Sequence, residues 1–413
     1  MTQDKQQTEK VEPYVAPNET FTTGPAKGLT PNVIFLGFIS FLGDIASEML
    51  YPIMPLFVST YLGVPVSGLG LIEGLAEATA SLLKVFSGAW TDRTRKRRPW
   101  IFAGYLLSAF ARPTIGAATG WTLVTAGRLL DRVGKGLRTS PRDALLADSV
   151  AAEFRGKAFG WHRGMDTLGA VLGPLVALGL IKYLDGNLRW VFYLAFLPGL
   201  VAALTVLWIR ELPATKKQTQ LKWQFKELPS NFWSFTLIIC LFSVCNSSDL
   251  FIFLKFQKLN SSMTELILCY CGFNLIYALL SPYLGALSDR IGKGRVFLFG
   301  LAVFAAAYTL FAISKSWVGM AGGFFVYGVY MAATEGISKA LAVDLAPSHL
   351  KGTALGVLGL SAGICSLIAS TTAGFLWDFL GPQAPFWLGA IGALLSATVY
   401  FLMRRNFKKS LAV

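Results

Sequence analysis

Acidic side chains recur inside otherwise apolar stretches of this sequence, where a carboxylate could bind and release a proton. Asp44 and Glu48 lie four residues apart, so they share one face of a helix. The same spacing joins Glu73 and Glu77. The candidate carboxylates are Asp44, Glu48, Glu73, Glu77, Asp131, Asp166, Asp249 and Glu335.

Basic residues inside the same apolar stretches are fewer than the acidic ones. They are Lys84, Arg112 and Arg128. An ionisable group near the middle of a bilayer is costly unless it is paired or faces water. We therefore expect some carboxylates to lack a basic partner and to act as proton carriers. The others are expected to form internal ion pairs, for instance between Arg112 and Glu73.

The composition places these charges in a membrane. Of 413 residues, 54% are hydrophobic and only 15% are charged, whereas an average soluble protein has about 25% charged residues. One bilayer span takes roughly 20 mostly apolar residues, so the chain can supply about ten to twelve spans. This excludes a nucleic-acid-binding protein and a cytosolic enzyme, despite the formal net charge of +14.

Apolar runs separated by short polar loops predict an all-α membrane protein with twelve transmembrane helices. We expect these helices at 32–61, 68–91, 99–118, 121–141, 157–181, 189–209, 232–255, 264–287, 295–313, 317–338, 352–377 and 386–403. The predicted units are a tail over 1–31, a six-helix bundle over 32–209, a linker over 210–231, a second six-helix bundle over 232–403 and a tail over 404–413. Most of the 37 Lys and Arg residues then fall on the side of the N-terminus. This bias predicts a cell inner (plasma) membrane protein with both termini in the cytoplasm.

Landmarks in the first half recur in the second half at a nearly constant distance. Asp92-Arg93 recurs 197 residues later as Asp289-Arg290, and Asp148 recurs 196 residues later as Asp344. A constant offset indicates an internal repeat. Transporters built from repeats hold their binding site between the two halves, near the middle of the membrane.

The repeated Asp-Arg pairs lie in two similar loops. The first reads Gly88-Ala-Trp-Thr-Asp92-Arg93, and the second reads Gly285-Ala-Leu-Ser-Asp289-Arg290-Ile-Gly292. An aspartate at a helix end can face the positive N-terminus of another helix, and an arginine can clamp a carboxylate through two hydrogen bonds. Such contacts, made in one conformation and broken in another, would form a gate. Solvated turns that only set the topology are the alternative.

This loop pattern resembles motif A of the major facilitator superfamily, GxLaDRxGrr. The second copy matches it nearly in full, whereas the first has Arg95 in place of the family's glycine. The resemblance covers roughly residues 30–405. It implies two pseudo-symmetric six-helix bundles that work as a secondary transporter by alternating access.

Two further stretches are similar to motifs of the same family. Arg128 stands where motif B has its arginine, although Asp131 and Arg132 replace the usual Gln-Gly. The resemblance links Arg128 to proton coupling, and a structural ion pair with Asp131 or Glu77 is the alternative.

The second stretch contains Gly160, Gly169, Gly173 and Pro174. It is similar to motif C, the signature of the antiporters in the superfamily, although Ala177-Leu178 replaces the closing Gly-Gly. Small residues at this spacing let helices approach closely, which is also what ordinary helix packing requires. The resemblance favours export over uptake.

Polar residues in the second half offer candidate contacts for a substrate. Asn246-Ser247-Ser248-Asp249 interrupts an apolar run, and Tyr327 and Tyr330 lie in the tenth predicted helix. We interpret Asn246, Tyr327 and Tyr330 as candidates for lining a substrate site. Bonding between neighbouring helices is their alternative role.

No signature of an enzyme is present: the sequence lacks GxSxG, HExxH and GxxxxGK[ST]. No metal site or cofactor is expected, because none of the five cysteines forms a CxxC pair and the chain has two histidines. We predict a proton-coupled efflux antiporter for a small organic solute, monomeric in the lipid bilayer. One alternative is an importer of an anionic organic solute or a siderophore-like metal chelate, with Arg112, Arg128 and Lys84 lining the site. Another is a non-transporting membrane receptor with the same fold.

Overall fold

The computed structural model describes residues 29–94, 96–150, 155–211, 227–259, 261–347 and 350–411. Most of the predicted tail over 1–31 and of the predicted linker over 210–231 lies outside these ranges. Within them the chain is helical and contains no strand. Eight helical segments are long and apolar enough to cross a membrane by length and composition.

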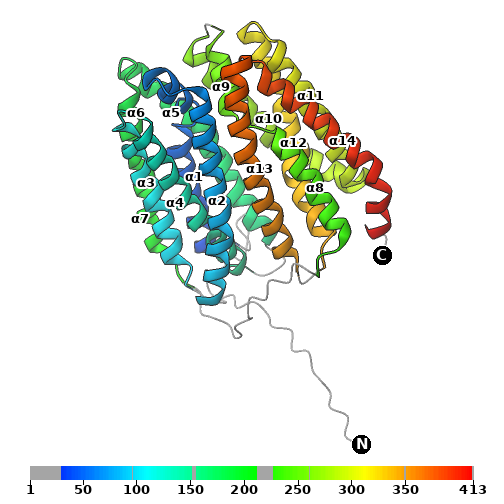
Figure 1. Cartoon of the computed structure of the whole chain (residues 1–413). Helices are drawn as coiled ribbons and strands as arrows, with labels where there is room; N and C mark the ends of the chain where they lie inside the picture. Colours follow the sequence, from blue (N-terminus) through cyan, green and yellow to red (C-terminus); the bar gives the residue numbers. More distant parts are fainter. Residues whose placement is uncertain are drawn as a thin grey trace, which may run out of the picture.

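The first half of the chain forms a group of helices that we call the N-terminal group (Figure 1). Its α-helices are α1 (Pro31–Glu48), α2 (Val66–Thr94), α3 (Arg98–Gly116), α4 (Trp121–Asp148), α5 (Arg155–Tyr183), α6 (Leu188–Leu194) and α7 (Phe196–Thr205). A π-helix covers Leu56–Tyr61, and a short 3-10 helix covers Val206–Trp208.

The second half forms the C-terminal group. Its helices are α8 (Ser230–Cys245), α9 (Leu250–Gln257), α10 (Met263–Ile291), α11 (Lys293–Ile313), α12 (Trp317–Asp344), α13 (Lys351–Leu380) and α14 (Ala384–Leu411). Each of the twelve predicted spans corresponds to one helix or to one run of helices in these two groups.

Some predicted spans have different bounds in the structure. The span predicted over 32–61 is not one helix, because α1 ends at Glu48 and a turn follows. Pro52 lies in that turn, and proline both lacks an N–H and disfavours helix in the residue before it. The span predicted over 232–255 is divided at Asn246–Asp249, where short polar side chains compete for backbone hydrogen bonds.

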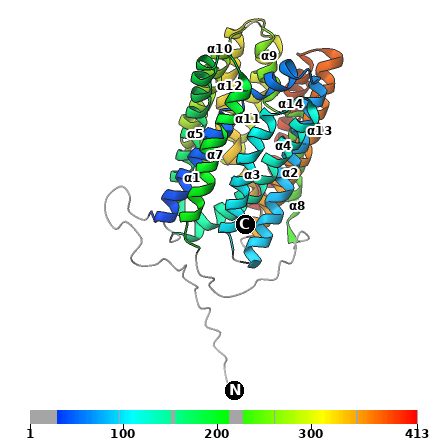
Figure 2. The same ribbon diagram turned by 90° about the vertical axis from the view of Figure 1, so that its left-hand side faces the viewer.

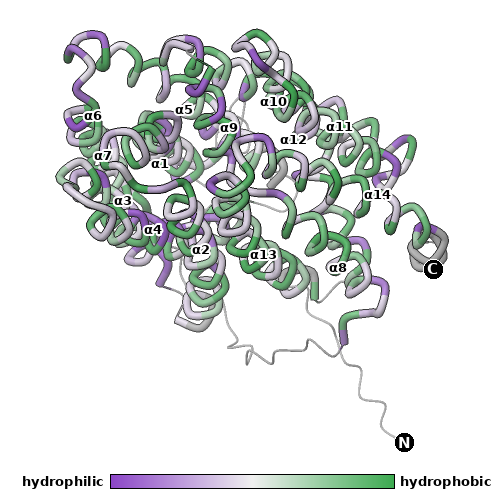
Figure 3. Tube along the Cα trace, turned by 45° about the horizontal axis from the view of Figure 1, so that its top comes forward, coloured by the Kyte–Doolittle hydropathy of each residue, from purple (hydrophilic) through white to green (hydrophobic). Residues whose placement is uncertain are grey.

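The two groups lie side by side with their long helices roughly parallel (Figures 1 and 2). We call the end at which α14 terminates the basal end, which is the lower end in Figure 1, and the opposite end the distal end. Within the N-terminal group, α1 packs on α5, and α4 packs on α2 and α3; within the C-terminal group, α12 packs on α10 and α11. The groups meet chiefly where α2 packs against α13 and where α5 packs against α10. Hydrophilic residues follow α4, whereas most of α13 is hydrophobic (Figure 3).

Glycines hold α2 and α13 in close contact over the distal half of the bundle. A Cβ atom on Gly70 would lie 2.2 Å from the carbonyl oxygen of Ser370, and one on Gly74 would lie 2.8 Å from the Cα of Leu367. Nearer the basal end of α13, Gly356 and Gly359 have nothing within 4 Å of such an atom. The two helices therefore separate toward the basal end, as Figure 1 also shows. We call the close contact between Ser67–Ser81 and 363–374 the glycine seam.

Candidate functional site

Ion pairs between α2 and α4 hold several of the predicted carboxylates. The guanidinium of Arg128 donates two hydrogen bonds to Glu73, one of them from Nε to Oε1 at 2.6 Å. Arg132 lies 3.9 Å from a carboxylate oxygen of Glu77 and 3.9 Å from one of Asp131. The sequence placed Glu73 with Arg112, and that pairing is wrong. Glu73 faces α4, and its partner is the arginine of the motif B-like stretch.

Helix α4 brings more positive charge to the interior than the sequence analysis expected. It runs without interruption to Asp148, beyond the predicted end at residue 141, so Arg142 lies on the same helix as Arg132 and Arg138. Arg132 and Arg138 are buried. With these three arginines the candidate bases number six rather than three, which is still fewer than the eight candidate carboxylates. Arg132, Lys135, Arg138 and Arg142 follow one another at steps of three or four residues. This spacing places side chains on one face of a helix and could have indicated the basic face from the sequence.

A pair of carboxyl groups lies between α1 and α5. The hydroxyl of Ser40 donates to Asp166 Oδ1 at 2.6 Å, and Arg163 donates to Asp166 Oδ2 at 3.1 Å. The side chain of Asp44 lies close to that of Asp166.

The glycines of the motif C-like stretch explain why α5 comes so close to these acids. A Cβ atom on Gly169 would lie 2.9 Å from the Cβ of Asp44, and one on Gly173 would lie 2.9 Å from the Cβ of Glu48. Pro174 follows within the helix. Gly160, nearer the basal end, has nothing within 4 Å and takes no part in this contact.

Tyrosine hydroxyls hold two other carboxyl groups. Tyr270 on α10 donates to Glu48 Oε2 at 2.7 Å, which joins the two groups of helices. Tyr327 on α12 donates to Asp249 Oδ1 at 2.7 Å, at the break between α8 and α9. In the part of the chain that the structure describes, neither Glu48 nor Asp249 forms an ion pair.

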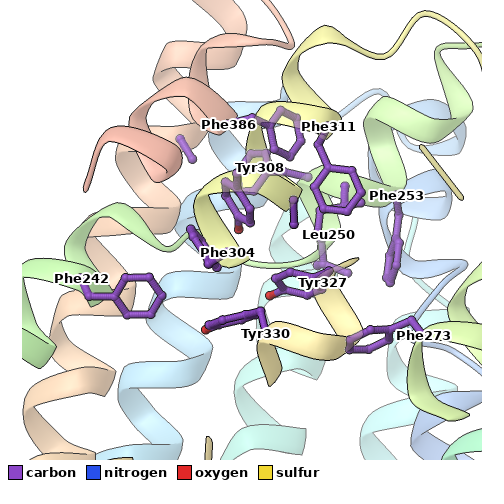
Figure 4. Close-up of a cluster of buried hydrophobic side chains, with 14 of the residues drawn as sticks. Phe242, Leu250, Phe253, Phe273, Phe304, Tyr308, Phe311, Tyr327, Tyr330 and Phe386 are labelled. Carbon is purple, nitrogen blue, oxygen red and sulfur yellow. The ribbon is translucent and has the colours of Figure 1, made fainter. Parts of the chain in front are cut away.

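The candidate substrate-lining residues lie in an aromatic cluster around that break. Tyr327 and Tyr330 are buried among Phe242, Phe304 and Tyr308 (Figure 4). Asn246 donates to the hydroxyl of Tyr330 at 3.5 Å and accepts a hydrogen bond from the hydroxyl of Tyr308 at 3.2 Å. These side chains therefore hold α8, α11 and α12 together around Asp249.

Arg163 links the carboxyl pair to the C-terminal group. Besides Asp166, its guanidinium donates to the hydroxyl of Tyr277 at 2.8 Å and lies 3.7 Å from Glu335. Tyr277 in turn donates to Glu335, and Lys339 lies 3.2 Å from the same carboxylate. A change at Asp166 therefore reaches α10 and α12 through one side chain. The sequence analysis did not single out Arg163.

The motif A-like loops are described only in part. The side chains of Asp92, Arg93 and Asp289 lie outside the described residues, as does Arg95. Gly88 packs on Ser140, Gly285 has open space, and Arg290 is exposed. Gly292 has a φ of 101°, a conformation that favours glycine, in the turn from α10 to α11.

An ion pair near each of these loops repeats between the two groups. Arg97 lies 2.5 Å from Asp148, and Lys293 lies 2.6 Å from Asp344. Arg97 precedes Lys293 by 196 residues, and Asp148 precedes Asp344 by the same number. The internal repeat seen in the sequence thus has a counterpart in side-chain contacts at the basal end.

A sequence profile of the Major Facilitator Superfamily matches residues 36–258 and 237–412 of the chain. The chain belongs to this superfamily. An uncharacterized MFS-type transporter of Methanocaldococcus jannaschii is 33% identical over 375 residues, which cover 89% of this chain and 94% of that protein. Multidrug resistance protein MdtH of Salmonella arizonae is 29% identical over 171 residues, 41% of each chain.

Solved structures share the fold of this major facilitator protein. A POT family transporter in complex with 5-aminolevulinic acid has a TM-score of 0.79 at 12% sequence identity, covering 94% of this chain and 99% of its own. The family and the fold make the chain a multi-pass membrane transporter with a small-molecule substrate, and not an enzyme. The predicted twelve-helix major facilitator fold is thereby confirmed.

Arg112, Arg128 and Lys84, which would line an anion site in the importer alternative, have different surroundings in this major facilitator structure. Arg112 is buried, donates to the carbonyl oxygen of Ala46 at 3.1 Å and packs against Gly199. Arg128 is held by Glu73. Among the described residues, neither Arg112 nor Lys84 has a bonded side-chain partner.

Proposed function

We propose that this transporter is a proton-coupled antiporter that exports a small organic solute by alternating access. One observation carries the proposal: Asp44, Glu48 and Asp249 form no ion pair within the described ranges, whereas the other candidate carboxylates do. A carboxylate paired with arginine stays ionised. One held by a tyrosine hydroxyl or by a second carboxyl group can gain and lose a proton as its access to water changes.

The arrangement of the helices supports a change of access between the two ends. The glycine seam brings α2 and α13 together on the distal side, and the same helices separate on the basal side. Asp44, Glu48 and Asp249 are only partly buried in this arrangement. We assign the basal end to the cytoplasm because most Lys and Arg residues lie there, and we place the protein in the inner (plasma) membrane.

The motif C-like contact supports antiport and export. Gly169 and Gly173 bring α5 against α1 at Asp44 and Glu48, so a proton on either acid alters the contact between these two helices. The relative MdtH is named a multidrug resistance protein, which agrees with export. The repeated basal loops, with Asp92 and Asp289, are proposed as the gate that closes the cytoplasmic side.

Proton movement driven by a solute gradient tests this function. The purified chain is placed in vesicles that contain a pH-sensitive dye, and organic cations, anions and neutral amphiphiles are added on one side in turn. Antiport predicts proton movement against the direction of the solute, which is absent from protein-free vesicles. Movement of both in the same direction would instead favour the importer, and solute movement without protons would contradict coupling.

A further inference from the structure

Three lysines from both groups of helices gather in the basal half of the interface. Lys84 lies on α2, Lys135 on α4 and Lys339 on α12. Among the charges that act on Lys84, that of Glu77 comes first, followed by those of Lys135, Arg132 and Lys339. Lys135 and Lys339 are exposed and Lys84 is partly buried. Because an ammonium group in contact with lipid tails is costly, exposure at this depth indicates access to water.

The acids near these lysines are engaged elsewhere. Within the described residues, neither Lys84 nor Lys135 has a carboxylate at ion-pair distance. Lys339 does contact Glu335, but that carboxylate is shared with Arg163 and with the hydroxyl of Tyr277. These acids are therefore bonded to other donors, and two of the three ammonium groups have no bonded partner among the described residues.

Glu77 acts on both Lys84 and Lys135, and Glu48 and Asp44 act on Lys135, all from beyond ion-pair distance. Glu77 lies nearest to Arg132, and Glu48 accepts a hydrogen bond from Tyr270. These acids moderate the positive field around the lysines but do not neutralise it by contact. Like charges held close together repel one another, so a mobile anion that enters between them would be bound.

We propose that Lys84, Lys135 and Lys339 bind the acidic group of the transported solute, which makes the substrate class an organic anion. This proposal rests on the proposed transport function and names its substrate. Ammonium groups bind carboxylate or phosphate oxygens as point charges with rotatable donors. Because the lysines come from both groups of helices, the site is complete only when those groups stand as they do here. The anion would enter from the basal end, where α2 and α13 separate.

Anion-dependent thermal stability of the purified full chain tests the site. The probes are citrate, glycerol 3-phosphate and benzoate, with choline and glycerol as cationic and neutral probes, all at constant ionic strength. At least one anion is expected to raise the melting temperature in a saturable way, and choline and glycerol are not. The absence of stabilisation by every anion, or stabilisation by choline alone, would overturn the proposal.

Matched variants locate the binding. Lys84→Gln and Lys135→Gln should each weaken the apparent affinity for the stabilising anion by at least about tenfold, and Lys84→Arg and Lys135→Arg should restore it. Lys182→Gln and Lys315→Gln remove exposed lysines at the distal end and should leave it unchanged. Unchanged binding in both interface Gln variants would place the anion elsewhere and refute the site.

The failure of this proposal and that of antiport are distinguishable. Saturable anion binding that depends on the lysines, with no solute-driven proton movement in vesicles, would contradict antiport and leave the anion site standing. Proton movement driven by cations or neutral solutes, without anion binding, would contradict the anion site and leave antiport standing.

Discussion

The variant Asp249→Asn is expected to reduce solute-driven proton movement by at least about tenfold while solute exchange across the membrane persists. Of the two candidate carboxyl groups in the C-terminal helices, Glu335 forms ion pairs whereas Asp249 forms none in the described structure, and the hydrogen-bond donor to Asp249 is the neutral hydroxyl of Tyr327. Asparagine retains the shape and can accept the same hydrogen bond, but it cannot carry a proton. Glu77, in contrast, lies beside Arg132 and is expected to remain ionised.

The measurement compares proton movement and exchange of labelled solute in the same vesicle preparation. Asp185→Asn is the matched control, since Asp185 is exposed in a distal loop at a φ of 50°, which asparagine tolerates well. Both activities should be normal in this control. If Asp249→Asn kept normal proton movement, Asp249 would not be a proton carrier.

Gly70→Leu is expected to prevent closure of the distal side and to slow transport severely. A Cβ atom at this position would meet a backbone oxygen of α13, which no side-chain rotation can remove. Forcing extra atoms into such a contact costs about 1–3 kcal/mol, which changes the ratio of the two conformations by roughly 5- to 150-fold. The population should shift toward molecules that are open at the distal end.

Distances between spin labels on the two groups report this shift. The labels replace exposed distal residues, as Asp185→Cys and Lys315→Cys, in a chain whose five native cysteines are changed to serine. Gly70→Leu should lengthen the distal distance, and Gly179→Leu, at a glycine with open space around it, should not. An unchanged distance together with normal transport would show that the glycine seam does not gate the distal side.

The sequence predicted which residues are buried ionisable groups better than it predicted their partners. Spacing along one helix shows which side chains share a face, as for Glu73 and Glu77, but not which helix lies opposite. Glu73 was therefore assigned to Arg112, although Arg128 on α4 holds it. The hydrophobic runs predicted the twelve helices, and the constant offset between recurring landmarks predicted the repeat, because both patterns are local in the sequence.

Contacts between the two halves could not be read from the sequence. The partners Glu48 and Tyr270 are 222 residues apart, and no local pattern connects them. Two signals were nevertheless present. Gly70 and Gly74 have the small-xxx-small spacing of a close helix contact, and the basic residues from Arg132 to Arg142 follow a helical period. Neither signal entered the prediction, which placed only Lys84, Arg112 and Arg128 among the interior bases and assigned close helix packing only to the motif C-like stretch.

Alternating access is tested most directly by measuring both ends of the same protein. One label pair spans the distal end at Asp185 and Lys315, and a second spans the basal end at exposed Thr94 and Arg295. Lowering the pH protonates the carboxyl groups that lack ion pairs and changes the balance between the two conformations. The account predicts opposite changes, with one distance lengthening as the other shortens. Distances that stay constant, or that change in the same sense at both ends, would contradict it.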